Sequence, residues 1–369
     1  MTNPHPPSET NKALRVQEGV PEPPSINPGL RAGRGRTWSV EAISVEAIVE
    51  GLRTGSRVAL ARAITLIEST RPEHRAQARA VVEQCLPLAG RSLRIGITGA
   101  PGAGKSTLIE ALGTRLTAAG HRLAVLAIDP TSERSKGSIL GDKTRMPRLA
   151  TDENAFIRPS PAGGSLGGVA RTTRETILLC EAAGYDLIFI ETVGVGQSET
   201  TVHSMVDFFL VLVLAGAGDE LQGLKRGLIE MADAVVVTKA DGDNVRAARL
   251  AQGQYQSALR LFPPLPSGWK PPVLTCSART GEGLEALWQT IQTYREQAIA
   301  SGYFEENRRR QAREWMLQTI EYRLREHFFN HPGVRAALAG LEAEVLEGRT
   351  SPFTAAEKLL ALYTARETP

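Results

Sequence analysis

The chain has 369 residues, of which 42% are hydrophobic, and this is enough for one large α/β domain with smaller attachments. Its formal net charge is only +3, which gives no overall electrostatic reason to expect a nucleic-acid partner. No apolar run is long enough to cross a bilayer, and residues 1–36 lack the apolar segment of a secretory signal.

The three cysteines, Cys85, Cys180 and Cys276, lie far apart in the sequence. They match neither a disulfide framework nor the paired spacing of a metal site, so we interpret them as small core residues. With no signal or membrane segment, this pattern favours a cytoplasmic location and no membrane partner.

The first part of the chain divides into two regions. Residues 1–37 are rich in Pro, Gly, Glu and Asn with almost no aliphatic periodicity, so we predict a disordered tail; a partner-binding arm is the alternative. Over 38–91, apolar residues recur at helical spacing, interrupted by Gly51, Gly55 and Pro72. This pattern predicts an N-terminal helical domain of two or three helices.

Residues 92–300 alternate between short apolar runs and helical stretches, which predicts an α/β domain with a mainly parallel, doubly wound sheet. Most of these runs lack polar alternation, as expected where a sheet is covered on both faces. The predicted strands are 93–98, 122–128, 155–158, 186–191, 208–214, 233–238 and 272–276. Residues 301–369 predict a C-terminal helical region with a long charged helix over 303–329 and two shorter helices over 333–347 and 353–365.

A complete phosphate-binding pattern, G-x-x-x-x-G-K-[ST], stands between the first predicted strand and a predicted helix. Its glycines let backbone N–H groups surround an anion, Lys105 is placed to reach the β- and γ-phosphates, and Ser106 is placed to ligate Mg²⁺. We therefore expect a nucleotide-binding protein. The expected contacts come from Gly102, Ala103, Gly104, Lys105, Ser106 and Thr107.

Three carboxylates lie where ligands bind in such sheets, at or after the carboxyl ends of strands. Asp129 and Glu191 each end an apolar run, and Asp142 lies in a later loop. One or more of them, directly or through water, would complete a Mg²⁺ shell with Ser106. An Asp-Pro turn at Asp129 and a solvated loop charge at Asp142 are the alternatives.

The sequence T-V-G-V-G-Q after Glu191 predicts a loop that responds to the γ-phosphate. It can become ordered when the Gly194 N–H meets the phosphate, and relax after hydrolysis. Gln197 would orient the attacking water, or else only stabilise the loop. Lys105, Glu191 and Gln197 are thus the candidate catalytic residues. The Gly-rich stretch 163–168 is equally compatible with a moving element and with a surface loop.

The sequence T-K-A-D that begins at Thr238 resembles the guanine-reading N-K-x-D motif, with Thr in place of Asn. Asp241 would accept hydrogen bonds from N1–H and the 2-amino group of guanine, which adenine lacks, and Lys239 would pack along the base. Ser277 and Ala278 resemble the S-A loop whose backbone N–H contacts guanine O6. We therefore favour GTP over ATP, and we expect Thr238 to affect affinity more than base identity.

Together these blocks resemble the MeaB/ArgK family of P-loop GTPases, bacterial relatives of the human methylmalonic aciduria type A protein. The resemblance covers about residues 40 to 330. The matching text is GAPGAGKST (99–107), DPTS (129–132), GSILGDKTRM (137–146), GGSLGGVA (163–170), EAAGYDLIFIETVGVGQSE (181–199) and GAGDELQGLKRGLIEMADAVVVTKADGDN (216–244). Several of these blocks are not generic to P-loop proteins, so the resemblance is specific.

The resemblance implies a SIMIBI-class P-loop NTPase fold with an N-terminal helical extension, a GTPase domain over 92–300 and a C-terminal dimerisation arm over 301–369. It implies a GTPase that binds Mg²⁺ with GTP or GDP and acts as a chaperone for an adenosylcobalamin-dependent acyl-CoA mutase. The adenosylcobalamin would belong to the mutase. The family's acidic metal positions correspond to Asp129, Asp142 and Glu191. A homodimer follows from the family, and packing of the arm on the chain's own core is the alternative.

Three other classes stay open. A metallochaperone GTPase shares the core, but six scattered histidines do not form a His-rich metal tract. A P-loop kinase or ATPase acting on a protein or small molecule would use the same phosphate loop, and competition between GTP and ATP separates it from a GTPase. A non-hydrolysing scaffold is the third. We also expect slow intrinsic hydrolysis, because no arginine stands in an obvious motif, and a solvated helix face at 308–310.

Overall fold

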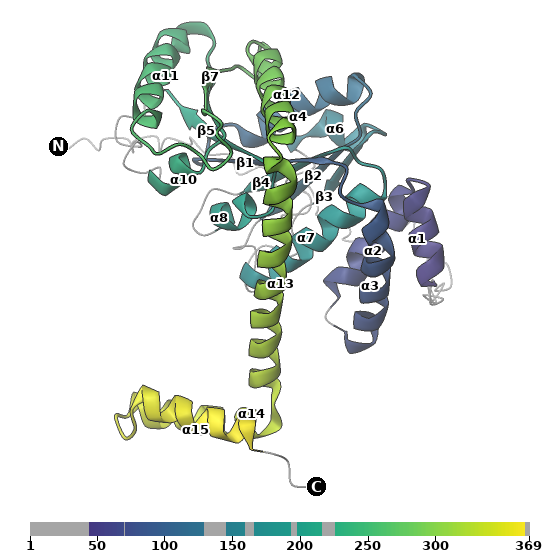
Figure 1. The fold of residues 1–369 in the computed structure, drawn as a ribbon, viewed down its shortest axis with the longest axis vertical. Helices are drawn as coiled ribbons and strands as arrows, with labels where there is room; N and C mark the ends of the chain where they lie inside the picture. Colours follow the sequence, from purple (N-terminus) through teal and green to yellow (C-terminus); the bar gives the residue numbers. More distant parts are fainter. Residues whose placement is uncertain are drawn as a thin grey trace, which may run out of the picture. The chain divides into compact units, whose positions relative to one another are not determined.

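A parallel sheet lies at the centre of the computed structural model (Figure 1). Within the described residues it has seven strands. The structure describes residues 44–69, 71–128, 145–158, 166–192, 198–215 and 226–365. The strands are β1 (Leu93–Gly99), β2 (Leu123–Ile128), β3 (Ala155–Arg158), β4 (Leu187–Thr192), β5 (Phe208–Leu214), β6 (Ala234–Thr238) and β7 (Val273–Thr275). Their order across the sheet is β3-β2-β4-β1-β5-β6-β7, and all neighbouring pairs are parallel. Each strand lies within two residues of its predicted bounds.

Helices cover both faces of this sheet. They are α4 (Lys105–Ala118), α6 (Pro147–Thr151), α7 (Leu166–Ala182), α8 (Ser198–His203), α10 (Arg226–Glu230), α11 (Val245–Leu259) and α12 (Leu284–Ala300), with the 3₁₀ turn η3 (Gly242–Asn244). On one face, Ile95 of β1 shares a core with Leu108 of α4 and Leu287 of α12. On the other, a Cβ added to Gly96 would lie 2.9 Å from the Val202 side chain of α8. The predicted doubly wound sheet is therefore confirmed, and its burial on both faces explains the unbroken apolar runs.

Among the described residues, three helices precede the sheet. They are α1 (Val45–Arg53), α2 (Arg57–Glu68) and α3 (Pro72–Cys85), followed by the 3₁₀ turn η1 (Leu86–Leu88). Ser44 and Ser56 are the N-caps of α1 and α2, and each side-chain oxygen accepts a backbone N–H of the first turn. These helices fall within the predicted helical region, while the predicted tail, 1–37, lies outside the described residues. The division into domains stays a prediction.

The start of the long C-terminal helix is fastened to the sheet. This helix, α13 (Tyr303–Asn330), places the Arg308 guanidinium against both carboxylate oxygens of Asp207, at 2.9 and 2.7 Å. The Arg308 side chain is only 12% exposed, so the predicted solvated face at 308–310 is wrong for this residue. Gln311 adds a bond from its Nε2 to the Val206 carbonyl, at 2.7 Å. Helical periodicity could not predict this burial, because the partner of Arg308 lies 101 positions earlier in the sequence.

Further along α13, large apolar side chains are exposed. Met316, Leu317, Ile320, Leu324 and Phe329 are between 42% and 58% exposed. The chain ends in α14 (Pro332–Leu346) and α15 (Pro352–Thr364), which contact each other. None of the helices that the structure describes is long and apolar enough to cross a membrane.

Candidate functional site

The phosphate-binding loop connects the carboxyl end of β1 to the first residue of α4. Gly99 ends β1 with φ 149°, and a Cβ at this position would collide with the Leu212 carbonyl oxygen of β5. Gly104 is the N-cap of α4 and has the left-handed φ of 84°. Both conformations favour glycine. They let the loop bend back, so that the first N–H groups of α4 remain available to an anion. This is the strand–loop–helix arrangement that the sequence predicts.

Lys105, the first residue of α4, is buried beneath the loop with 8% of its surface exposed. Its Nζ donates to the carbonyl oxygens of Gly99, at 2.9 Å, and Ala100, at 3.2 Å. Burial lowers the pKa of this ammonium, and the nearby carboxylates of Glu191 and Glu199 oppose that shift. The side chain is thus held at the loop, where a bound polyphosphate would add further negative charge.

Ser106 and Glu191 meet at the predicted metal position. The Ser106 hydroxyl donates to Oε1 of Glu191 at 2.9 Å, and Glu191 is 8% exposed. Two adjacent ligands of an octahedral Mg²⁺ lie about 2.9 Å apart, because each lies about 2.0–2.1 Å from the ion. Both donors are hard oxygens, so the pair fits one edge of a magnesium shell. Within the described ranges, no three His, Cys, Asp or Glu side chains converge on one metal position.

The predicted base-reading residues come together from two loops. The Asp241 carboxylate accepts a hydrogen bond from the Ser277 hydroxyl at 2.5 Å, and the Ala240 N–H donates to the Cys276 carbonyl at 3.0 Å. Lys239 has φ 55°, the only positive φ outside glycine among the residues described. Ala278 follows Ser277 directly in this loop. The carboxylate that would read guanine is therefore fixed by a neighbouring side chain.

Two further side chains stabilise the base-reading loop through hydrogen bonds that the motif alone does not predict. The Nδ2 of Asn244 donates to the Lys239 carbonyl at 2.7 Å. The Thr238 hydroxyl lies 2.7 Å from the Ala103 carbonyl and 3.2 Å from the Val213 carbonyl. Thr238 therefore connects the base-reading loop to the phosphate-binding loop.

Four predicted site residues, Asp129, Asp142, Gly194 and Gln197, lie outside the described residues. Of the remainder, Ala103 is fully buried and Thr107 is exposed. The roles predicted for all of the site residues, in phosphate binding, metal binding, catalysis and base recognition, stay predictions.

The structure also places charged residues near Lys105 that sequence reasoning missed. Glu199, 9% exposed, and Arg145 both act on the pKa of Lys105, the carboxylate raising it and the guanidinium lowering it. Arg145 belongs to the block GDKTRM. Nothing in the neighbouring sequence indicates that it lies near the phosphate-binding loop.

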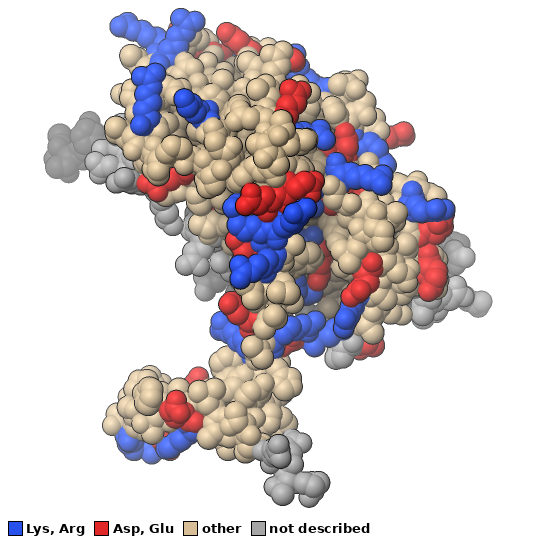
Figure 2. Space-filling view, in the orientation of Figure 1, with Lys and Arg blue, Asp and Glu red and all other residues tan. Residues whose placement is uncertain are grey.

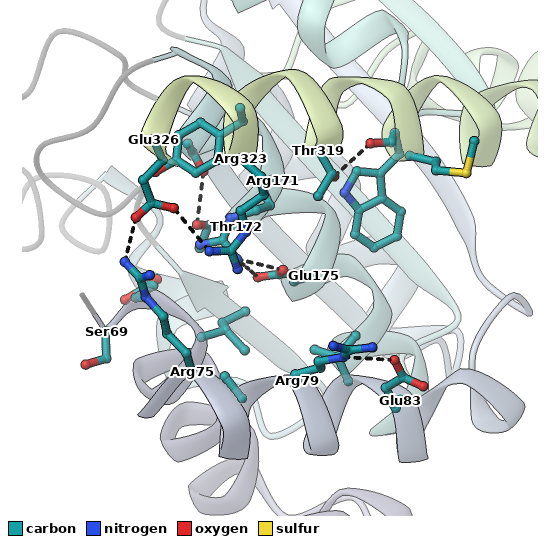
Figure 3. A pocket seen from close by; sticks show the side chains of 18 of the residues that line it. Ser69, Arg75, Arg79, Glu83, Arg171, Thr172, Glu175, Thr319, Arg323 and Glu326 are labelled. Carbon is teal, nitrogen blue, oxygen red and sulfur yellow. Dashed lines mark hydrogen bonds and ion pairs between the residues drawn. The ribbon is translucent and has the colours of Figure 1, made fainter. Parts of the chain in front are cut away.

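A separate cavity of about 1080 Å³ lies among α3, α7 and α13, and Figure 3 shows it from close by. Its charged side chains pair with one another: Arg171 with Glu175 at 2.8 Å, and Arg75 with Glu326 at 2.5 Å. None of the nucleotide-site residues that the structure describes lines it. The cavity is therefore distinct from the nucleotide site, and its charges are internally compensated.

The family comparison agrees with the geometry of the nucleotide site. The family described as methylmalonyl-CoA mutase-associated GTPase MeaB matches residues 60–333, which include all of the described nucleotide-site residues. The chain belongs to the MeaB family. It is accordingly a GTPase, a guanine-nucleotide-binding enzyme that hydrolyses GTP, and its fold is that of a P-loop NTPase.

Named relatives of this MeaB-family chain cover most of its length. A mouse protein named methylmalonic aciduria type A homolog, mitochondrial, is 49% identical over 332 residues, 87% of this chain and 80% of the relative. GTPase ArgK of Escherichia coli is 48% identical over 289 residues, 78% of this chain and 87% of the relative. A crystal structure of a LAO/AO transport system kinase superposes with a TM-score of 0.68 at 38% identity, covering 86% of this chain and 97% of that chain.

Proposed function

We propose that this GTPase is a chaperone for an adenosylcobalamin-dependent acyl-CoA mutase. GTP binding and hydrolysis would time the delivery of cofactor to the mutase and its protection or reactivation, and the adenosylcobalamin would be the mutase's own. The observation that carries the proposal is the match over 60–333 to a family described as mutase-associated. The mouse relative, named for methylmalonic aciduria, supports the same partner class. A cytoplasmic location remains a prediction.

We assign the following roles to the residues of the nucleotide site. The N–H groups of the loop and Lys105 would hold the β- and γ-phosphates, and Asp241 would select guanine. Ser106 and Glu191 would hold Mg²⁺, which supplies charge neutralisation at the phosphates. Gln197 would orient the attacking water.

The test of the chaperone role is single-turnover GTP hydrolysis by the purified chain, alone and with a purified adenosylcobalamin-dependent mutase. We expect slow hydrolysis alone and a faster rate with the mutase, because transition-state charge stabilisation can come from a partner. Lys105→Ala, which removes the phosphate-binding ammonium, is the control for contaminating activity. Equal rates with and without the mutase, together with no complex between them, would contradict the proposal.

We further propose that residues 301–369 form the arm of a homodimer. The exposed apolar residues of α14 and α15 support this, since Leu346 is 88% and Phe353 75% exposed. Figure 2 shows that the visible surface of this helical pair is mostly uncharged. Light scattering should give a dimer for the wild type and a monomer for Leu346→Glu/Phe353→Glu, while the exposed control Arg349→Ala stays dimeric. A monomeric wild type at micromolar concentration would contradict the arm's role.

A second candidate function, a P-loop kinase, is favoured by the name of the structural relative, a LAO/AO transport system kinase. The two functions differ in base and in product. Competition between GTP and ATP for binding separates them, because tight ATP binding is incompatible with the role given to Asp241.

A further inference from the structure

Two buried threonine hydroxyls meet between the strand that leads to the phosphate-binding loop and the strand that carries Glu191. Thr98 lies near the end of β1, Thr192 is the last residue of β4, and both are fully buried. The Thr192 hydroxyl donates to the Thr98 hydroxyl at 2.8 Å. The two residues are 94 positions apart in the sequence, so only the fold brings them together.

The threonine pair lies where the backbones of β1 and β4 stop pairing. The register of these strands ends with Ile97 opposite Glu191, one residue before each threonine. From there, β1 still pairs with β5 as far as Gly99, and β4 still pairs with β2 as far as Thr192. Among the described residues, the side-chain bond therefore continues the pairing of β1 and β4 by one residue at the carboxyl edge of the sheet.

Each threonine is adjacent to a residue of the nucleotide site. Thr98 precedes Gly99, the first glycine of the phosphate-binding pattern. Thr192 follows Glu191, whose carboxylate accepts a hydrogen bond from the Ser106 hydroxyl at 2.9 Å. The threonine pair thus joins the strand end that begins the phosphate-binding loop to the strand end that holds the proposed metal ligand.

A hydrogen-bonded hydroxyl pair holds two side chains closer together than apolar groups can. The two oxygens are 2.8 Å apart, whereas two carbon atoms make their best contact at about 3.5–4.0 Å. Two valines of the same shape would therefore separate the strand ends by roughly 1 Å. Mg²⁺ requires near-ideal octahedral geometry with ligands at about 2.0–2.1 Å, so a displacement of this size at Glu191 would weaken its binding.

We propose that Thr98 and Thr192 are positioning residues that set the place of the Glu191 carboxylate relative to Ser106 for Mg²⁺ binding. Both hydroxyls are fully buried, so they act through the backbone at the end of β4 and not by contact with the ion. This inference deepens the proposed function, and it rests on the assignment of Ser106 and Glu191 to the metal.

The test measures how Mg²⁺ slows the release of a fluorescent GDP analogue from the full chain, which requires no hydrolysis. In Thr98→Val/Thr192→Val, the Mg²⁺ concentration for half-maximal slowing should rise about three- to tenfold, while release without Mg²⁺ stays within about twofold of the wild type. Thr192→Ser, which keeps the hydroxyl, should titrate as the wild type does. Thr176→Val is the matched control, because this buried hydroxyl bonds within α7, and its magnesium titration should be unchanged.

Thermal stability separates positioning from a merely structural role. Each single valine variant leaves the other hydroxyl buried without its partner and should lower Tm by about 1–4 °C. The double variant leaves neither hydroxyl unpaired, so its loss should be smaller than the two single losses together. If the pair were only structural, magnesium binding would follow stability. Positioning predicts instead that the double variant is at least as impaired toward Mg²⁺ as either single variant.

Three results would overturn the inference. A double variant that titrates like the wild type, or that binds Mg²⁺ better than the single variants, shows that the pair does not place Glu191. A Thr192→Ser variant as impaired as Thr192→Val assigns the effect to the methyl group. If Glu191→Gln also left the magnesium titration unchanged, the metal assignment itself would fail, and this result is distinguishable from failure of the threonine pair alone.

Discussion

Replacing Arg308 with Ala should destabilise the protein strongly, because this side chain fastens α13 to the sheet. It makes two bonds to Asp207, and it also donates to the carbonyl oxygens of Gly90 and Ser92, each at 2.6 Å. The Asp207 side chain is only 1% exposed. After the substitution, the Arg94 N–H, at 2.8 Å, would be the donor left to this carboxylate among the described residues.

The expected cost follows from the burial of this pair. Removing one partner of a buried ion pair leaves an uncompensated charge and costs about 3–5 kcal/mol. In a chain of 369 residues, that corresponds to a fall in Tm of about 4–6 °C. Calorimetry or denaturant unfolding of Arg308→Ala measures it, with the exposed neighbour Arg309→Ala as the control, for which we expect a change below about 0.5 kcal/mol.

A second substitution tests the cause of the loss. Asp207→Asn in the Arg308→Ala background removes the stranded charge, so it should recover part of the lost stability. The reasoning is refuted if Arg308→Ala lowers the free energy of unfolding by less than about 1 kcal/mol. It is also refuted if the double variant is less stable than Arg308→Ala alone.

Three more predictions concern single residues. Ser106→Ala removes one oxygen donor from the proposed metal site, so the Mg²⁺ concentration for half-maximal GTP hydrolysis should rise about tenfold; an unchanged magnesium titration would exclude Ser106 as a ligand. Ser277→Ala removes the hydroxyl that holds Asp241, so the Kd for GDP should rise about three- to tenfold in a displacement assay, and an unchanged Kd would mean that Asp241 needs no such support. Burial raises the pKa of Asp233 from 3.8 to about 7, so the folded chain holds a proton that the unfolded chain has lost above about pH 4. This contribution to stability is full below pH 4 and is lost as the pH rises through about 7. Asp233→Asn, which keeps an acceptor for the Phe209 N–H, should flatten the dependence of Tm on pH between 5 and 8, and an unchanged slope would contradict this assignment.

The sheet and the phosphate-binding loop were predictable because their signals are local. A strand that is buried on both faces must be apolar throughout, and the loop needs glycines, a lysine and a hydroxyl at fixed spacing. The meeting of Ser106 with Glu191 was predictable as well, because parallel strands bring their carboxyl ends to one edge of the sheet.

The remaining features depend on contacts between distant parts of the sequence. Arg308 carries the same charge as the other two arginines of 308–310, and only the position of Asp207 in space distinguishes it from them. The second role of Thr238 was hidden for the same reason, since the Ala103 carbonyl that it bonds lies 135 residues away. Asn244 braces Lys239 from a turn, η3, whose conformation no periodicity predicts.

The position of β1 between β4 and β5 also bears on how the chain acquires its structure. β1 is made early, but β4 begins roughly 100 residues later and β5 later still. A ribosome adds about 5–20 residues per second, so β1 is synthesised several seconds before its partner strands β4 and β5. Such distant pairing slows folding and leaves an apolar strand uncovered in the meantime, so nascent chains that are interrupted before Leu187 should be prone to aggregate.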